Sequence, residues 1–194
     1  CIRDRCQLLL EKAPQEELEQ VLFRDVLGEA KTHVSGSAGR IGNVKLSAQI
    51  INGLVLNSGE TFSYNGSVGK RTADRGFKPA PAYVKGETVD EIGGGICQVA
   101  TTVFNAVYEA GYPVTERRNH SLYISSYPTG RDAAIAYPDL DLTWVNDGTS
   151  DVLMRSRYTD SSLTVTLYGI DPGYVVSTQT GDWETGEPFK KRTK

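Results

Sequence analysis

Residues 93–106 read Gly93-Gly94-Gly95-Ile96-Cys97-Gln98, followed by VATTVFNA. Three consecutive glycines let a backbone turn tightly and approach other groups closely. The apolar residues after them recur at helical spacing, as Ile96, Val99, Val103, Phe104, Val107 and Tyr108. This spacing predicts a buried amphipathic helix over 96–110 that ends at Gly111, with Pro113 as a stop signal just beyond.

Cys97 lies in the first turn of this predicted helix. A thiol there is exposed to the positive end of the helix dipole and to unpaired amide N–H groups, and both favour the thiolate. This is the environment of many nucleophilic cysteines. A small half-buried cysteine that only packs would occupy the same position, so both interpretations stay open.

The bulk composition is that of an ordinary globular protein. The chain has 194 residues, 39% of them hydrophobic and 23% charged, which is enough for one domain with appendages. A net charge of -3 argues against nucleic-acid binding. No apolar run approaches the roughly 20 residues that span a bilayer. Because the chain begins with Cys1 and not Met, we expect it to be a processed or excised piece whose true ends, and any export signal, lie outside it.

The rest of the chain predicts an α+β fold, with a mostly antiparallel sheet packed against two core helices, Asn43–Leu54 and Ile96–Ala110. A Gly turn at residues 85–87 predicts a hairpin between 82–84 and 88–89. We expect extended segments at 61–64, 114–123 and 133–137. A C-terminal β meander is expected over 140–145, 152–158 and 163–168. In the last segment, apolar residues alternate regularly with others, at Leu163, Val165 and Leu167.

The ends differ in composition from the middle. Leucine periodicity over 6–22, interrupted by Pro14, predicts an N-terminal helical appendage, and residues beyond 170 turn polar. We therefore divide the chain into an appendage (1–25), a central domain (26–170) and a polar tail or linker (171–194). Cys1 and Cys6 can pair with each other or a partner chain, or stay unpaired, and that choice is open.

An ordered set of short motifs identifies a family resemblance. The motifs are Gly59-Glu60-Thr61-Phe62-Ser63-Tyr64-Asn65, Val68-Gly69, Arg75-Gly76-Phe77, Gly93-Gly94-Gly95-Ile96-Cys97-Gln98, Thr101-Thr102, Asn105-Ala106, Arg118-Asn119-His120-Ser121 and Gly130-Arg131-Asp132-Ala133. Together they resemble the VanW family over roughly Val26 to Gly169. One small departure is His33, where an aromatic or apolar residue is usual.

VanW-like proteins are mainly bacterial and are named for an accessory protein of a vancomycin-resistance gene cluster. They often lie outside the membrane, beside peptidoglycan-binding or small β modules. The resemblance therefore implies an extracytoplasmic, cell-envelope setting with peptidoglycan or a cell-wall peptide as partner. It does not supply a biochemical activity, which has to be argued from the residues.

The residues suggest a thiol site. A nucleophilic cysteine needs a base within hydrogen-bond reach, and the base needs an orienting group. Cys97 at the helix start, His120 on the following extended segment and Asp132 at the next turn supply these three types. We predict that Cys97 and His120 meet at one cleft, with Asp132 or Arg118 beside them. Such a site would be a peptidase or acyl transferase.

Substrate-binding roles are assigned to neighbours of these three. Gln98, or the amides of Ile96 to Gln98 after the turn at Gly94 and Gly95, would donate to an oxyanion. Arg118 would bind a substrate carboxylate in a bidentate fork. Tyr123 would contact the ligand. We predict no metal and no cofactor, because the three chemical residues are scattered without a short-spaced ligand pair.

Two other functions are retained beside the enzyme. The first is a binding module, in which the glycine turn and helix start hold a carboxylate or a sugar-peptide without chemistry. The second is a structural spacer between envelope modules. In that case Cys97 is only a small buried packing residue, and His120 is a turn residue whose hydrogen bonds are made within the fold. Thiol reactivity separates the enzyme from both, and a saturable ligand separates the binding module from the spacer.

Overall fold

The structure is a computed structural model that describes residues 22–84, 87–179 and 181–182. The predicted helical appendage over 6–22 and both N-terminal cysteines lie outside these residues, and so does most of the predicted tail.

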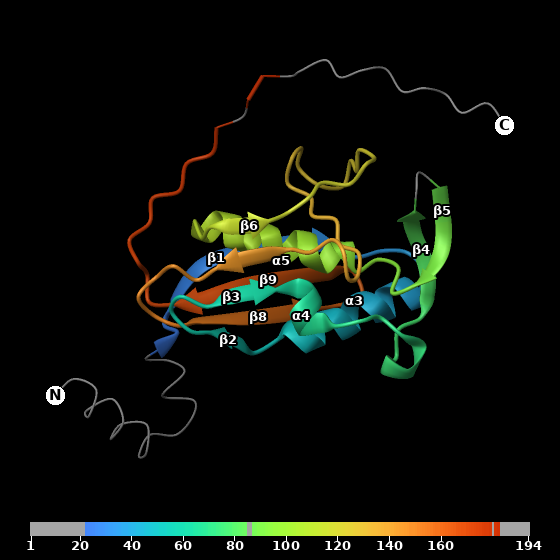
Figure 1. The fold of residues 1–194 in the computed structure, drawn as a ribbon, viewed down its shortest axis with the longest axis horizontal. Coiled ribbons are helices and arrows are strands. Elements are labelled where there is room, and N and C mark those ends of the chain that lie inside the picture. Colours follow the sequence, from blue (N-terminus) through green and yellow to red (C-terminus); the bar gives the residue numbers. More distant parts are fainter. Residues whose placement is uncertain (1–21, 85–86, 180, 183–194) are drawn as a thin grey trace.

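The main sheet joins the two ends of the central domain (Figure 1). Its four strands run in the order β1-β9-β8-β2, all antiparallel. Their bounds are β1 Asp25–His33, β9 Ser162–Gly169, β8 Val152–Tyr158 and β2 Leu54–Leu56. Along its length β1 pairs with β9, from Asp25 opposite Gly169 to His33 opposite Ser162. The first and last described strands are therefore neighbours.

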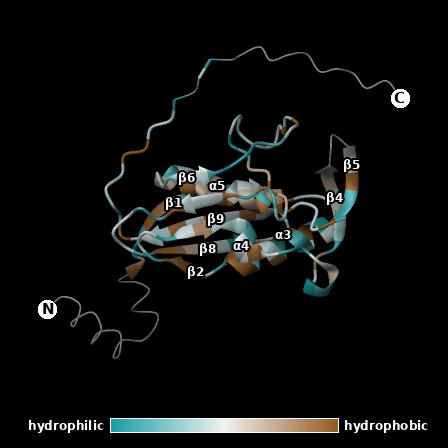
Figure 2. Ribbon diagram, viewed as in Figure 1, coloured by the Kyte–Doolittle hydropathy of each residue, from teal (hydrophilic) through white to brown (hydrophobic). Residues whose placement is uncertain are grey.

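Both predicted core helices are present and pack on this sheet. Helix α5 (Cys97–Ala110) lies along β1 and β9, and α3 (Ala38–Ile51) lies along β8. Helix α3 begins five residues before the predicted start because Ser37 caps it, with Ser37 Oγ accepting a hydrogen bond from Arg40 N at 3.3 Å. Figure 2 shows hydrophobic segments on both helices and on the strands beside them.

A second sheet and a hairpin complete the domain. The second sheet has the order β3-β7-β6, with bounds Thr61–Ser63, Thr143–Val145 and Val114–Glu116. The hairpin pairs β4 (Pro79–Val84) with β5 (Glu87–Ile92). A short helix, α4 (Tyr64–Val68), and a 3-10 turn, η1 (Ala73–Arg75), connect β3 to the hairpin. Neither of these short helices was predicted.

The α+β prediction is confirmed, and so is the hairpin. The C-terminal meander is present only in part. Strands β8 and β9 form the predicted hairpin, but β7 pairs with β3 and β6 in the other sheet. The predicted extended segments at 114–123 and 133–137 are also largely absent as strands, because after Glu116 they share only the isolated bridge between Arg118 and Ala134.

The first residues of the predicted tail contact the domain. Tyr174 packs edge-on against Tyr112, with ring centroids 6.0 Å apart, and its hydroxyl donates to Asp147 at 3.2 Å. Thr178 shares a hydrogen bond of 3.2 Å with the hydroxyl of Tyr108 on α5. Residues 174–178 therefore run beside the C-terminal end of α5, and the domain boundary at 170 stays a prediction.

Candidate functional site

Cys97 is the first residue of α5, directly after the glycine triplet. Ile96 is the N-cap and provides no side-chain cap. Cys97 is half-buried, and its Sγ lies 3.6 Å from the carbonyl oxygen of Ile135. The thiol therefore lies at the N-terminus of a mostly buried helix, as the sequence predicts, with one face toward a cleft.

The three glycines are required by three close approaches. Gly93 and Gly95 have φ values of 89° and 98°, which L side chains rarely adopt. A Cβ at Gly93 would lie 2.9 Å from Arg71 Cβ, and one at Gly95 would lie 2.6 Å from Arg40 Cγ. A Cβ at Gly94 would overlap the carbonyl oxygen of Ala80 in β4. The triplet therefore brings two arginine side chains and the hairpin backbone against the start of α5.

His120 and Asp132 form a hydrogen-bonded pair. His120 Nδ1 lies 2.6 Å from Asp132 Oδ2, and the His120 backbone N–H donates to the same oxygen at 2.7 Å. The His120 and Asp132 side chains are only 13% and 14% exposed. With Nδ1 facing Asp132, the ring nitrogen left for the Cys97 side chain is Nε2, and Cys97 contributes to the raised pKa of the imidazole.

The electrostatics of the pair follow from these contacts. Burial alone would lower the pKa of His120, but the hydrogen bonds to Cys97 and Asp132 outweigh it and raise that pKa. Burial would raise the pKa of Asp132, but its hydrogen bonds with the His120 backbone and ring lower it. The site therefore favours an ionised Asp132 beside a His120 that holds a proton more readily than a free imidazole.

Arg117 anchors Asp132, and sequence reasoning missed this role. Its Nε donates to the Asp132 carbonyl at 2.7 Å, and its Nη2 donates to the Gly130 carbonyl at 2.7 Å and to Asp132 Oδ1 at 3.2 Å. Its guanidinium also lies 5.0 Å from the centroid of the Phe104 ring. The neighbouring Arg118, to which a carboxylate-binding role was assigned, is exposed and does not line the cleft.

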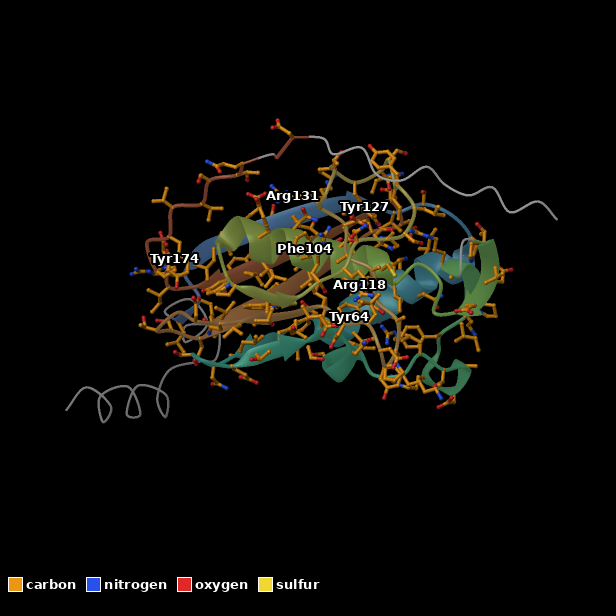
Figure 3. The ribbon with its side chains drawn as sticks, turned by 45° about the horizontal axis from the view of Figure 1, so that its top comes forward. Tyr64, Phe104, Arg118, Tyr127, Arg131 and Tyr174 are labelled. Carbon is orange, nitrogen blue, oxygen red and sulfur yellow. The ribbon has the colours of Figure 1, made fainter. Side chains whose placement is uncertain are left out.

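The cleft at Cys97 has a volume of about 590 Å³. Besides Cys97, Gln98 and His120, its lining includes Arg40, Lys70, Arg71, Glu91, Tyr127 and Tyr137. Tyr127, labelled in Figure 3, comes from the irregular loop before Asp132, and burial raises its pKa to about 12. A second cleft of about 630 Å³ lies against β8 and β9, and no cysteine or histidine is among its described lining residues.

Of the remaining residues predicted to bind substrate, three line the cleft and one lies outside it. Gly94 and Gly95 line the cleft, whereas Tyr123 is 75% exposed and lies outside it. Gln98 lines the cleft but its amide is already engaged. Its Nε2 donates to Thr32 Oγ1 at 2.9 Å and to the His33 carbonyl at 2.8 Å, and its Oε1 accepts from Arg40 at 2.8 Å. Gln98 therefore fixes β1 and Arg40 to α5.

Of the three amides from Ile96 to Gln98, one remains as a candidate oxyanion donor. The N–H of Ile96 donates to Gly93 and the N–H of Gln98 donates to Gly95, at 3.3 and 3.1 Å. For the Cys97 N–H, no acceptor is found among the described residues. The Cys97 amide is thus the donor that remains for a developing oxyanion next to its own thiol.

The described residues contain neither a metal-binding cluster nor a membrane-spanning helix. Within residues 22–84, 87–179 and 181–182, no group of three or more His, Cys, Asp or Glu residues is arranged to hold a metal ion. None of the helices described there is both long and apolar enough to cross a membrane.

Comparison with known proteins supports the motif-based resemblance. Residues 39–168 match the family model described as VanW like protein. The chain belongs to the VanW family. It is 40% identical over 146 residues to the uncharacterized protein YoaR of Bacillus subtilis (strain 168), an alignment that covers 75% of this chain and 48% of YoaR.

A second VanW-family relative carries a functional name. The chain is 29% identical over 113 residues to the vancomycin B-type resistance protein VanW of Enterococcus faecalis (strain ATCC 700802 / V583), covering 56% of this chain and 41% of that protein. The chain therefore spans less than half the length of both curated relatives. No solved structure matches it significantly.

Proposed function

We propose that this VanW-family domain is a cysteine-dependent acyl hydrolase or acyl transferase. Cys97 is the nucleophile, His120 the general base and Asp132 the group that orients His120. One observation carries the proposal: Asp132 holds the imidazole at Nδ1, and His120 lines the same cleft as Cys97, whose side chain helps to raise the pKa of that imidazole. This is the arrangement in which a base can take a thiol proton and later return it.

The chemistry follows from the positions of these groups. The Cys97 Sγ attacks an acyl carbon of the substrate, and its proton passes to His120 Nε2. The tetrahedral oxyanion accepts a hydrogen bond from the Cys97 N–H. Collapse breaks the bond to the leaving amine, which takes the proton from His120 and leaves a thioester on Cys97. Water completes hydrolysis, or a second amine completes transfer, and either restores the thiol.

The substrate class and the setting are part of the proposal. VanW of Enterococcus faecalis is named a resistance protein against vancomycin. We propose that the present domain likewise acts at the cell envelope, outside the cytoplasm, on peptidoglycan stem peptides. The cleft at Cys97, about 590 Å³, has the size of a small-ligand or peptide site.

The test is to trap the thioester. Full-length chain is incubated with a mixture of peptidoglycan fragments and analysed by intact-protein mass spectrometry, with Cys97→Ser and His120→Ala variants in parallel. We expect acylation of Cys97 in the unaltered chain, none in Cys97→Ser, and a rate lower by at least about 100-fold in His120→Ala. Fragments processed equally by all three proteins would refute the proposal.

A binding module without chemistry is the second candidate. The observation that favours it is the set of cationic side chains in the cleft, Arg40, Lys70 and Arg71, beside the unengaged Cys97 N–H. In that case Cys97→Ser would bind the same fragments with unchanged affinity, and no acyl adduct would form on the unaltered chain.

A further inference from the structure

Arg71 lines the Cys97 cleft, and only part of its guanidinium group forms hydrogen bonds. Its Nη1 donates to Asn65 Oδ1 at 2.7 Å and to the Gly69 carbonyl at 3.2 Å. Its Nε and Nη2 are buried, and neither has a hydrogen-bond partner among the described residues. No carboxylate of the described residues forms a salt bridge with Arg71. Within the part of the chain that the structure describes, one edge of a guanidinium group is thus buried without an acceptor to pair with it.

Leaving that edge unpaired costs free energy. A buried donor without an acceptor gives up its hydrogen bonds to water, and the cost is largest when the donor is charged. Burial accordingly lowers the pKa of Arg71. A ligand that supplied acceptors to this edge would remove that cost.

The geometry of the unpaired edge selects the ligand. Nε and Nη2 together form the fork that matches the two oxygens of a carboxylate. The guanidinium carbon lies 5.7 Å from the centroid of the Tyr64 ring and 5.9 Å from that of Tyr137. Gly93 leaves room for the Arg71 stem. The guanidinium plane is therefore held in place before a ligand arrives.

The other basic side chains of the cleft differ from Arg71. Arg40 donates from Nη1 to the Ser35 carbonyl and from Nη2 to Gln98 Oε1, so both of its terminal nitrogens already have a partner. Lys70 is exposed and is a point charge without a fork. Glu91 is the acidic residue among the lining side chains. The cleft is therefore cationic in a chain whose net charge is -3.

We infer that Arg71 binds a carboxylate of the substrate and so selects acidic peptides for the Cys97 site. The carboxylate belongs to a free peptide C-terminus or to an acidic side chain near the reacting bond. The inference extends the proposed function, on which it rests for the statement that the bound group belongs to a substrate. Arg71 takes the place that the sequence assigned to Arg118.

Equilibrium binding tests this without any need for turnover. The Cys97→Ala variant of the chain is titrated with three N-acetylated tripeptides, and NMR monitors binding. The first peptide has a free C-terminal carboxylate, the second has a C-terminal amide and no charge, and the third has a C-terminal amide and a glutamate side chain. We expect at least one carboxylate peptide to bind about tenfold more tightly than the neutral amide. Which of the two does so identifies the source of the carboxylate.

Arg71→Gln should abolish this advantage, whereas Lys70→Gln, the same loss of charge in the same cleft, should keep most of it. If Arg71→Gln does not fold, Arg71→Lys retains the charge without the fork and should also lose the advantage. Equal binding of all three peptides, or no binding up to about 10 mM, overturns the inference. Equal losses in the glutamine variants would assign selectivity to cleft charge and overturn it as well.

The two proposals fail separately. Absence of a thioester on Cys97 would remove the enzyme and leave carboxylate binding by Arg71 intact. Acylation of Cys97 with equal binding of acid and amide peptides would keep the enzyme and remove the role of Arg71.

Discussion

Asp132 is the residue on which the geometry of the site depends most. It accepts hydrogen bonds from the His120 backbone and ring, and from Arg117. Sequence reasoning found Cys97, His120 and Asp132 because each is of a chemically distinctive type. It chose Arg118 and not Arg117 because it assumed an alternating strand through His120. The chain has no ladder there after Glu116, so alternation could not predict which arginine turns inward.

Arg117 and Arg118 form a matched pair for mutation. Arg117→Ala removes three hydrogen bonds to the 130–132 turn and a contact with the Phe104 ring, and we expect the free energy of unfolding to fall by about 1.5–3 kcal/mol. Arg118→Ala, at an exposed side chain, should change it by less than about 0.5 kcal/mol. Chemical denaturation measures both. Equal effects would contradict the anchoring role of Arg117.

Asp132→Asn should change the pH dependence of stability. Because the pKa of His120 is raised on folding, its protonation stabilises the fold fully below about pH 6.5, and that contribution is lost as pH rises through the folded pKa. Replacing the carboxylate lowers the pKa of His120 and shrinks this dependence. NMR titration of the imidazole, assigned with His33→Gln, measures the pKa directly. An unchanged His120 pKa in Asp132→Asn would refute the pairing.

The start of α5 is the element that assembles the cleft. Its glycine triplet and apolar spacing are local signals, and for that reason the sequence predicted this helix almost to the residue. The pairing of β7 with β3 and β6 was not predictable in the same way. The β3–β7 pairing joins segments about 80 residues apart, at Phe62 opposite Trp144, and the hydrophobic alternation of β7 fits a meander equally well.

Two glycines give opposite expectations for alanine. Gly94→Ala would place a Cβ against the backbone of Ala80, which cannot move without shifting β4, and should cost at least about 2 kcal/mol of unfolding free energy. Gly42→Ala, in α3 with nothing within 4 Å of the new Cβ, should stabilise by about 0.5–1 kcal/mol. Thermal unfolding of both variants, at matched protein concentration, provides the comparison. A tolerated Gly94→Ala would contradict the close approach.

At the scale of the whole molecule, β1 closes the domain although it precedes the family match at 39–168. It pairs with β9 along its length and lies against α5, where Thr32 Oγ1 bonds Thr102 Oγ1 at 2.8 Å. The carbonyl of His33 accepts from Gln98 next to Cys97. Strand β1 therefore supports both the sheet edge and the helix that carries the thiol.

Deleting β1 should prevent folding. A chain that begins at Gly39 loses a whole ladder and the Ser37 cap, and a typical domain has only about 5–15 kcal/mol of stability in all. A chain that begins at Leu22 retains both and should unfold cooperatively. Circular dichroism during heating distinguishes them. Cooperative unfolding of the chain from Gly39 would show that the matched segment is self-sufficient.

The central claim, that Cys97 is a nucleophile activated by His120, is tested most directly by thiol reactivity. We would measure the rate of alkylation of Cys97 by neutral iodoacetamide at pH 7, in a Cys1→Ser, Cys6→Ser background. The account predicts a rate about tenfold above that of a free cysteine, lost in His120→Ala and reduced in Asp132→Asn. A rate at or below that of free cysteine, unchanged by His120→Ala, would make Cys97 a packing residue.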